Sequence, residues 1–187
     1  MQPATPSQTV GPFFHDALAY AGSDHVVPID DPSAIRIEGR VLDGAGDAVP
    51  DALLETWQAS RSGRYAHPED SRREQPLEAG FSGFGRVATD EQGHFALVTV
   101  KPGAVPAPGG AMQAPHIDVS VFARGLLRRL VTRIYFPDER DANAADPVLG
   151  SIEDARERAT LIAREQGGSL CFDVHLQGAD QTAFFSI

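Results

Sequence analysis

The stretch Pro115-His-Ile-Asp-Val-Ser-Val-Phe122 alternates polar and apolar residues with the period of a β-strand. In a strand, the apolar residues from Ile117 to Val121 lie on one face, and His116 and Asp118 lie on the other. One such strand therefore predicts a sheet with a buried face and a polar face, and it places two polar side chains together.

Five further segments have the composition or alternation of strands. Val131-Thr-Arg-Ile-Tyr-Phe136 alternates in the same way and sets Arg133 and Tyr135 on one face. In chain order, the six predicted strands are Ile35–Leu42 and residues 52–59, 94–100, 117–123, 130–136 and 170–177. The first two, separated by a polar turn at residues 43–47, are predicted to be two strands of one sheet.

One helix is predicted near the C-terminal end of the sequence. Ser151 followed by Asp154 resembles a capping box, and apolar residues then recur at helical spacing until Gly167-Gly168. Many short strands with one late helix predict a mostly β protein, a β-sandwich with long loops. We expect a single domain, with an N-terminal arm at residues 1–33 and the sandwich at residues 34–187.

Composition excludes several classes of function. The 187 residues include 16 Lys and Arg against 26 Asp and Glu, a net charge of −10, so nucleic acid is not the expected partner. The one basic run, residues 124–133, is interleaved with apolar residues and is interpreted as a strand region. No stretch approaches the ~20 apolar residues of a membrane span, and residues 1–10 lack signal-peptide features, so a soluble cytoplasmic protein is expected. The single cysteine, Cys171, is expected to be buried in a strand.

Three polar segments are too long for a minimal sandwich: the arm before Ala34, residues 61–85 and residues 102–115. Long loops in a compact domain tend to carry function, so a site is expected among them. No GxSxG elbow is present, and Gly44-Ala-Gly46 lacks the third glycine and the helix of a nucleotide loop, so it is interpreted as a turn.

Spacing alone leaves the candidate site residues open to two interpretations. His116 and Asp118 are either a ligand pair or a polar strand face, since metal sites usually need three or more ligands. Arg133 either recognises a carboxylate or is solvated or salt-bridged on its strand. Tyr65, on the first long loop, either binds a ligand or packs against an edge of the hydrophobic core.

Four stretches together resemble the intradiol ring-cleavage dioxygenases: Thr5-Pro-Ser-Gln-Thr-Val-Gly-Pro-Phe13, Glu55-Thr-Trp-Gln-Ala59 with Gly63-Arg-Tyr65, Val100-Lys-Pro-Gly103 with Ala114-Pro-His-Ile117, and Thr132-Arg-Ile-Tyr-Phe136. The resemblance extends from about Thr5 to Phe185, nearly the whole chain. Within the family it is closest to the alpha chains of enzymes built from alpha and beta chains.

The resemblance implies a non-haem ferric site with two tyrosine and two histidine ligands, of which this chain keeps half. Tyr65 matches one tyrosine and His116 one histidine, whereas Val105 and Asp118 stand at the other two positions. Valine offers no donor atom, so no metal and no catalytic residue is expected in this chain, and Fe(3+) is expected in a partner beta chain.

The resemblance further implies repeated alpha-beta units that cleave protocatechuate with O2 to 3-carboxy-cis,cis-muconate. In that arrangement the alpha chain lines the substrate cleft with Thr9, Gly11, Pro12 and Phe13 on its arm and with Arg133 on a strand. Apolar arm residues, including Phe13, Phe14 and Leu18, are expected to need a partner to cover them.

Two alternatives remain at this point. One is a self-sufficient dioxygenase in a homo-oligomer, in which Tyr65, His116 and Asp118 hold iron. The other is a β-sandwich scaffold or binding module that takes no part in an active site.

Overall fold

The structure is a computed structural model that describes residue 9, residue 11 and residues 14–186. Its elements in chain order are α1 (Phe14–Leu18), β1 (Ile35–Leu42), β2 (Leu53–Gln58), β3 (Phe84–Ala88), β4 (His94–Thr99), β5 (Val105–Pro106), a 3-10 turn η1 (Pro108–Gly110), β6 (Met112–Gln113), β7 (His116–Phe122), β8 (Leu130–Tyr135), α2 (Arg140–Ala145), α3 (Pro147–Gly150), α4 (Ala155–Thr160), β9 (Arg164–Gln166), β10 (Ser169–Cys171) and β11 (Val174–His175).

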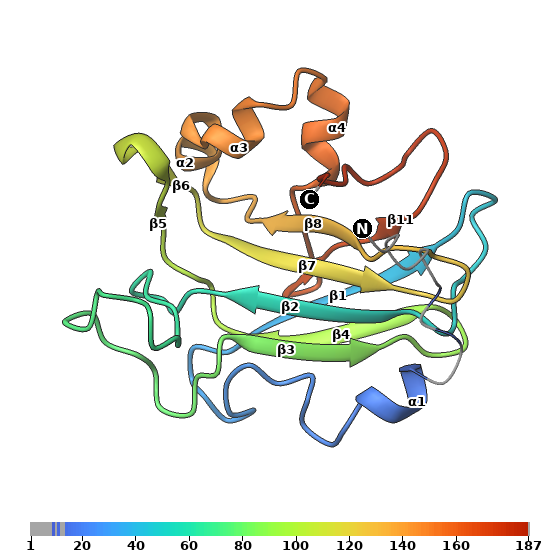
Figure 1. The fold of residues 1–187 in the computed structure, drawn as a ribbon, viewed down its shortest axis with the longest axis horizontal. Helices are drawn as coiled ribbons and strands as arrows, with labels where there is room; N and C mark the ends of the chain where they lie inside the picture. The colour runs from blue at the N-terminus through green and yellow to red at the C-terminus, as the bar shows by residue number, and fades with distance from the viewer. Residues whose placement is uncertain (1–8, 10, 12–13, 187) are drawn as a thin grey trace, which may run out of the picture.

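Two sheets pack against each other through one hydrophobic core (Figure 1). In the first sheet, β1 pairs with β4 and also with β10 and β11, and β9 extends β10. The second sheet is antiparallel, in the order β3-β2-β7-β8. Ile37 of β1, Leu54 of β2 and Ile117 of β7 belong to one cluster of buried side chains. The predicted β-sandwich is confirmed.

The alternation predicted for β7 is confirmed residue by residue. Ile117 and Val121 are fully buried in the core between the sheets, so the opposite face of the strand carries His116 and Asp118. On β8, Ile134 faces the same core, and Arg133 lies on the other side. A period of two on each strand therefore separates the core from a polar face.

The prediction that residues 35–42 and 52–59 share a sheet is wrong. The turn forms as expected, with Asp43 N–H donating to the Asp47 carbonyl, and the hairpin continues as far as Val49, whose N–H donates to Val41. Pro50 follows and has no N–H for the next ladder bond, and the chain then joins the other sheet as β2.

The helix predicted between Ser151 and Gly167 is shorter than expected: only α4 forms there, followed by a strand, and two further short helices, α2 and α3, precede it. The N-cap of α4 is Asp154, whose side chain accepts from the Arg156 N–H, so the helix does not begin at Ser151. Residues 164–166 form β9, which pairs with β10. Gly167 and Gly168, expected to end the helix, both have positive φ, as a tight two-residue hairpin turn requires.

The last predicted strand, 170–177, divides into β10 and β11 along the same edge of β1. The division lies at Phe172, whose carbonyl oxygen would be only 1.8 Å from a Cβ on Gly39, so β1 needs a glycine there. Cys171 lies in β10 as expected but is only half-buried, which corrects the prediction of a buried thiol.

The predicted loops also contain short strands. Residues 61–85 end at the start of β3, which pairs with β2. Residues 102–115 hold the β5–β6 hairpin, in which Val105 is opposite Gln113. These strands fix part of each loop on the fold.

The three helices α2, α3 and α4 lie together beyond the β8 edge of the second sheet (Figure 1). They are held there by a second apolar cluster in which Tyr135 packs with Leu149 and Leu161. Tyr135 thus uses its ring for packing, and its hydroxyl remains on the polar face of β8.

The described part of the arm packs partly onto the sandwich. Phe14 is buried against Phe122, with ring centroids 6.5 Å apart, so it is covered within this chain, whereas Leu18 is 41% exposed. Phe13 lies outside the described residues. Val26 and Val27 join a third buried cluster with Leu97.

None of the helices in residues 14–186 has the length and apolar character needed to span a membrane.

Candidate functional site

The polar faces of β7 and β8 meet because the two strands are in register. Asp118 is opposite Arg133, and His116 is opposite Tyr135. Directly opposite residues on one face are close enough for their side chains to interact. The antiparallel pairing thus brings together two residues that sequence predicted as ligand positions and the arginine predicted to bind substrate.

The Arg133 guanidinium lies at the centre of this cluster. Its Nε donates to Asp118 Oδ1 over 2.8 Å, and its Nη1 donates to Gln113 Oε1 over 2.7 Å and to the Tyr135 hydroxyl over 3.3 Å. The side chain is 18% exposed. One cation therefore joins β6, β7 and β8.

Asp146 extends the cluster toward the helices. The Tyr135 hydroxyl donates to Asp146 Oδ1, which also caps α3 by accepting from the Val148 and Leu149 N–H groups. Asp146 Oδ2 accepts from the Ala114 N–H, and the residue is buried. Burial raises the pKa of Tyr135 well above its usual range, so its hydroxyl stays protonated.

His116 is buried and electrically neutral. Its Nδ1 is 2.7 Å from the Ala114 carbonyl oxygen, which can only accept, so Nδ1 carries the proton and Nε2 has the lone pair. That Nε2 lies 3.9 Å from Asp118 Oδ2. Burial, reinforced by the charge of Arg133, lowers the pKa of His116 below its ordinary value.

Tyr65 lies on the loop that follows β2. Its ring stacks on Trp57 with centroids 6.0 Å apart and planes 2° apart, and its N–H donates to Asp70. Burial and the charge of Asp118 raise the pKa of Tyr65. Because the charges of Asp118 and Arg133 both act on this phenol, it lies in the neighbourhood of the cluster.

A glycine lets the Tyr65 loop approach β5. Gly63 has a φ of 82°, and a Cβ there would be 2.3 Å from the Ala104 carbonyl oxygen, next to Val105. Val105 itself is buried. The Tyr65 loop therefore lies beside β5, so the four positions marked by the resemblance lie in one region of the fold.

The residues in that region do not fit a ferric ion. Val105 has no donor atom, which leaves Tyr65, His116 and Asp118 to hold a trivalent metal. The carboxylate of Asp118, the only anionic member of the three, already binds the Arg133 guanidinium. Within the described residues, no group of three or more His, Cys, Asp or Glu side chains could hold a metal ion.

Thr9 of the arm lies at the other end of β7. Thr9 Oγ1 accepts a hydrogen bond of 3.2 Å from the N–H of Gly125, in the turn between β7 and β8. The seven residues of β7 give it a length of about 20 Å, so the arm contact and Arg133 are far apart on the same hairpin. Gly11 has a φ of 79°, and Pro12 and Phe13 lie outside the described residues.

Arg124 is the arginine that lies beside the arm, and sequence analysis missed it. It directly precedes Gly125 in the turn, its side chain is 63% exposed, and its Nε is 2.9 Å from Asp51 Oδ2. The available signal was the basic run at residues 124–133, which begins in this turn and continues into β8.

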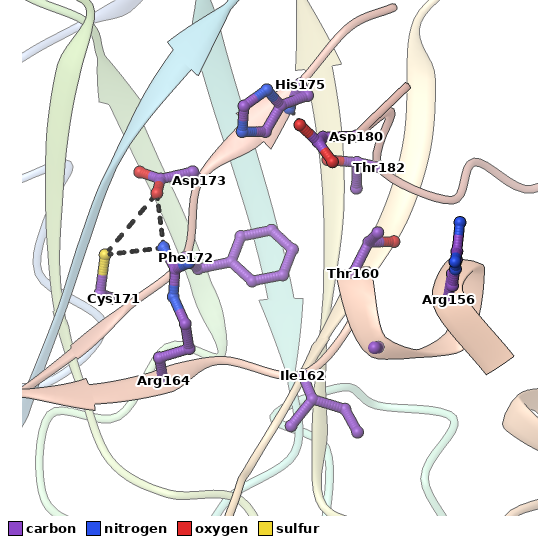
Figure 2. Close-up of a pocket in the computed structure, with 11 residues that line it drawn as sticks. Arg156, Thr160, Ile162, Arg164, Cys171, Phe172, Asp173, His175, Asp180 and Thr182 are labelled. Atoms are coloured by element: carbon purple, nitrogen blue, oxygen red, sulfur yellow. Dashed lines mark hydrogen bonds and ion pairs between the residues drawn. The ribbon is translucent and has the colours of Figure 1, made fainter. Parts of the chain in front are cut away.

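Two pockets lie at or near these elements. One, of about 800 Å³, is lined by Trp57, Tyr65 and Arg72 and opens beside the aromatic pair. The other, of about 460 Å³, lies between α4 and the β9–β11 strands (Figure 2). In that second pocket Arg164 donates to Asp173 over 2.7 Å, and Cys171 lies next to this pair. None of the predicted ligand positions lines it.

Comparison with known proteins agrees with the fold. A family model described as "Dioxygenase" matches residues 10–178. The chain is 43% identical to the protocatechuate 3,4-dioxygenase alpha chain of Pseudomonas putida, over 98% of this chain and 96% of the relative. It is 38% identical to the beta chain of Burkholderia cepacia, over 96% of this chain and 78% of the relative.

A solved structure has the same architecture. It is the dioxygenase domain of a dioxygenase carbohydrate-binding protein fusion from Streptomyces sp. SirexAA-E, with a TM-score of 0.58 and 27% identity. The match covers 95% of this chain and all of that one. From its matched family model, its relatives and its fold, this chain belongs to the intradiol dioxygenase family, whose members are iron-dependent enzymes.

Proposed function

We propose that this chain is the alpha subunit of a protocatechuate 3,4-dioxygenase. It pairs with a beta chain of the same fold that carries the ferric ion, in repeated alpha-beta units. The observation that carries the proposal is the ion pair between Arg133 and Asp118, beside Val105, at positions where a catalytic chain needs metal ligands. The identity of 43% with an alpha chain, over nearly the full length of both, supports it.

The reaction adds both atoms of O2 to protocatechuate and opens the ring between its two hydroxylated carbons. The product is 3-carboxy-cis,cis-muconate. The ferric ion in the beta chain supplies the activation of the catechol. This chain's residues bind and orient the substrate, which lowers the barrier by proximity and by electrostatic positioning. We place the complex in the cytoplasm, as the sequence predicts.

The arm and the β7–β8 turn form the part of this chain that meets the substrate cleft. Thr9 is exposed and hydrogen-bonded to the turn, and Gly11 adopts a backbone conformation that few other residues allow. Pro12 and Phe13 complete the predicted lining.

Protocatechuate carries a ring carboxylate, so a cation beside the arm would offset its burial. Arg124 is exposed at that turn, and we propose it for this role. The substrate contact predicted for Arg133 stays a prediction. Its Nη2 forms no hydrogen bond with other described residues, so this nitrogen still has donors available for a carboxylate.

The test is to express this chain alone and together with its candidate beta chain, and to measure bound iron and protocatechuate-dependent oxygen uptake in each preparation. Iron and activity only where the beta chain is present, at one iron per alpha-beta pair, is the expected result. Iron and turnover in this chain alone would overturn the proposal in favour of the self-sufficient enzyme. A stable complex whose turnover matches that of the beta chain alone would indicate a scaffold.

A further inference from the structure

Arg133 occupies an unusual place for a strand arginine. Its guanidinium binds Asp118, one of the three donor-bearing positions where the family resemblance implies metal ligands, and it is mostly buried there; His116, a second such position, lies next to Asp118. An arginine cannot lose its proton in a protein, so this positive charge is permanent.

The surrounding side chains are arranged as they would be around a cation. Asp118 Oδ1 accepts a hydrogen bond from Arg133, and Asp118 Oδ2 lies 3.9 Å from His116 Nε2, the nitrogen that has the lone pair. The side-chain carbonyl oxygen of Gln113 accepts a hydrogen bond from the guanidinium. The charge of Arg133 also acts on the Tyr65 phenol. An oxygen anion, a neutral imidazole and a phenol are metal-binding groups, and here the first binds the guanidinium directly while its charge acts on the other two.

We propose that the Arg133 guanidinium is a built-in cation that replaces the metal ion in this chain. It neutralises Asp118, joins β6, β7 and β8, and excludes metal ions from the remaining donors by its fixed charge. The absence of a donor at Val105 is then a second and separate obstacle to metal binding.

The physical argument rests on charge at short range. A divalent ion bound to Asp118 would lie within a few ångströms of the guanidinium, where like charges repel strongly in a partly buried site. Neutralising position 133 removes that repulsion and frees the Asp118 carboxylate. Tyr65, His116 and Asp118 then provide three donors, enough for weak binding of a divalent transition metal.

The experiment is a titration of the full chain with Co2+, followed by equilibrium dialysis and by the visible absorption of the bound ion. Where the chain is purified with its partner, spectra are taken as differences from the wild-type complex. Arg133→Gln is expected to bind one additional Co2+ per chain, with at least tenfold higher affinity than the wild type. Adding Asp118→Asn to this variant should abolish the gain.

Two further variants separate charge from shape. Arg133→Lys keeps the positive charge but not the planar fork, so it should exclude Co2+ as the wild type does. Arg129→Gln removes an exposed arginine from the preceding turn and serves as the matched control. Binding by Arg133→Lys equal to that by Arg133→Gln would overturn the role of charge.

A folded Arg133→Gln chain that binds no more Co2+ than Arg129→Gln would overturn the proposal and leave Val105 as the only obstacle. Should Arg133→Gln lose its fold by circular dichroism, Co2+ present during refolding restores it under the proposal, and a failure to do so contradicts it. Because these readouts measure metal on this chain and not turnover, the proposed alpha-subunit function can stand or fall separately.

Discussion

The two ends of the β7–β8 hairpin differ in what they do with their charges. At the end near β6, Arg133 is bound by Asp118, Gln113 and Tyr135 and is largely shielded from solvent. At the turn, Arg124 is 63% exposed and has an ion pair with Asp51 alone among described residues. The end that holds Arg133, which we call the closed end, is thus part of the internal structure. The turn that holds Arg124, which we call the open end, is accessible to a second molecule.

The largest expected effect is a loss of stability at the closed end, caused by Asp146→Ala. This substitution leaves the N–H groups of Ala114, Val148 and Leu149 without their acceptor, and also the Tyr135 hydroxyl. We expect a loss of about 3 kcal/mol in the free energy of unfolding, measured by urea denaturation. As a control, Asp154→Ala removes an exposed cap from α4 and should cost about 1 kcal/mol. Equal losses in the two variants would contradict the importance of the closed end.

The second prediction compares the two arginines directly in stability. Arg133→Ala leaves Asp118 unpaired in a partly buried site and should lower the free energy of unfolding by about 2 kcal/mol. Arg124→Ala removes a surface ion pair and should change it by less than about 0.5 kcal/mol. Both values come from denaturant unfolding curves measured under the same conditions. A larger loss of stability for Arg124→Ala than for Arg133→Ala would contradict the proposed difference between the two ends.

The third prediction concerns the open end in the alpha-beta complex. Arg124→Ala should raise KM for protocatechuate about tenfold, with less change for catechols that lack the carboxylate. Steady-state oxygen uptake with both substrates measures this, and Arg133→Ala is assayed beside it. A carboxylate-dependent loss in Arg133→Ala alone would confirm the original prediction for that residue and refute the role proposed for Arg124.

The smallest expected effect is at the arm. Thr9→Val removes the acceptor for the Gly125 N–H and should raise KM for protocatechuate about twofold, without a change in unfolding free energy. Thr9→Ser keeps the hydroxyl and should behave as the wild type. If the serine variant shows the same increase in KM as the valine variant, the hydrogen bond is not what positions the arm.

Sequence patterns were sufficient for the local features of this fold. Alternation in residues 115–122 and 131–136 correctly placed Ile117 and Ile134 in the core, with Asp118 and Arg133 on the opposite face. The absence of a donor at Val105 was also readable from the sequence. The period of a strand depends only on its own residues, which is why these predictions succeeded.

Predictions that depend on pairing between distant segments were less successful. Residues 35–42 and 52–59 are neighbours in sequence but lie in different sheets, because Pro50 interrupts their hairpin. Residues 164–166, Arg-Glu-Gln, are good helix formers that follow the apolar helical spacing ending at Ile162, yet they pair with β10 through the turn at Gly167-Gly168. In the first case a proline ends the local hairpin, and in the second a pairing contact overrides the local preference for a helix.

The sequence by itself determined the strands of a β-sandwich, because residue types and strand periods are local properties, and its resemblance to the intradiol dioxygenases implied that the metal ligand set is incomplete. Only the tertiary structure decided which arginine lies beside the arm and which lies among the ligand positions. That choice depends on the β7–β8 register, which places Arg133 opposite Asp118 and leaves Arg124 in the turn next to Thr9. Register is set by long-range packing and hydrogen bonds between strands, and no single segment carries that information.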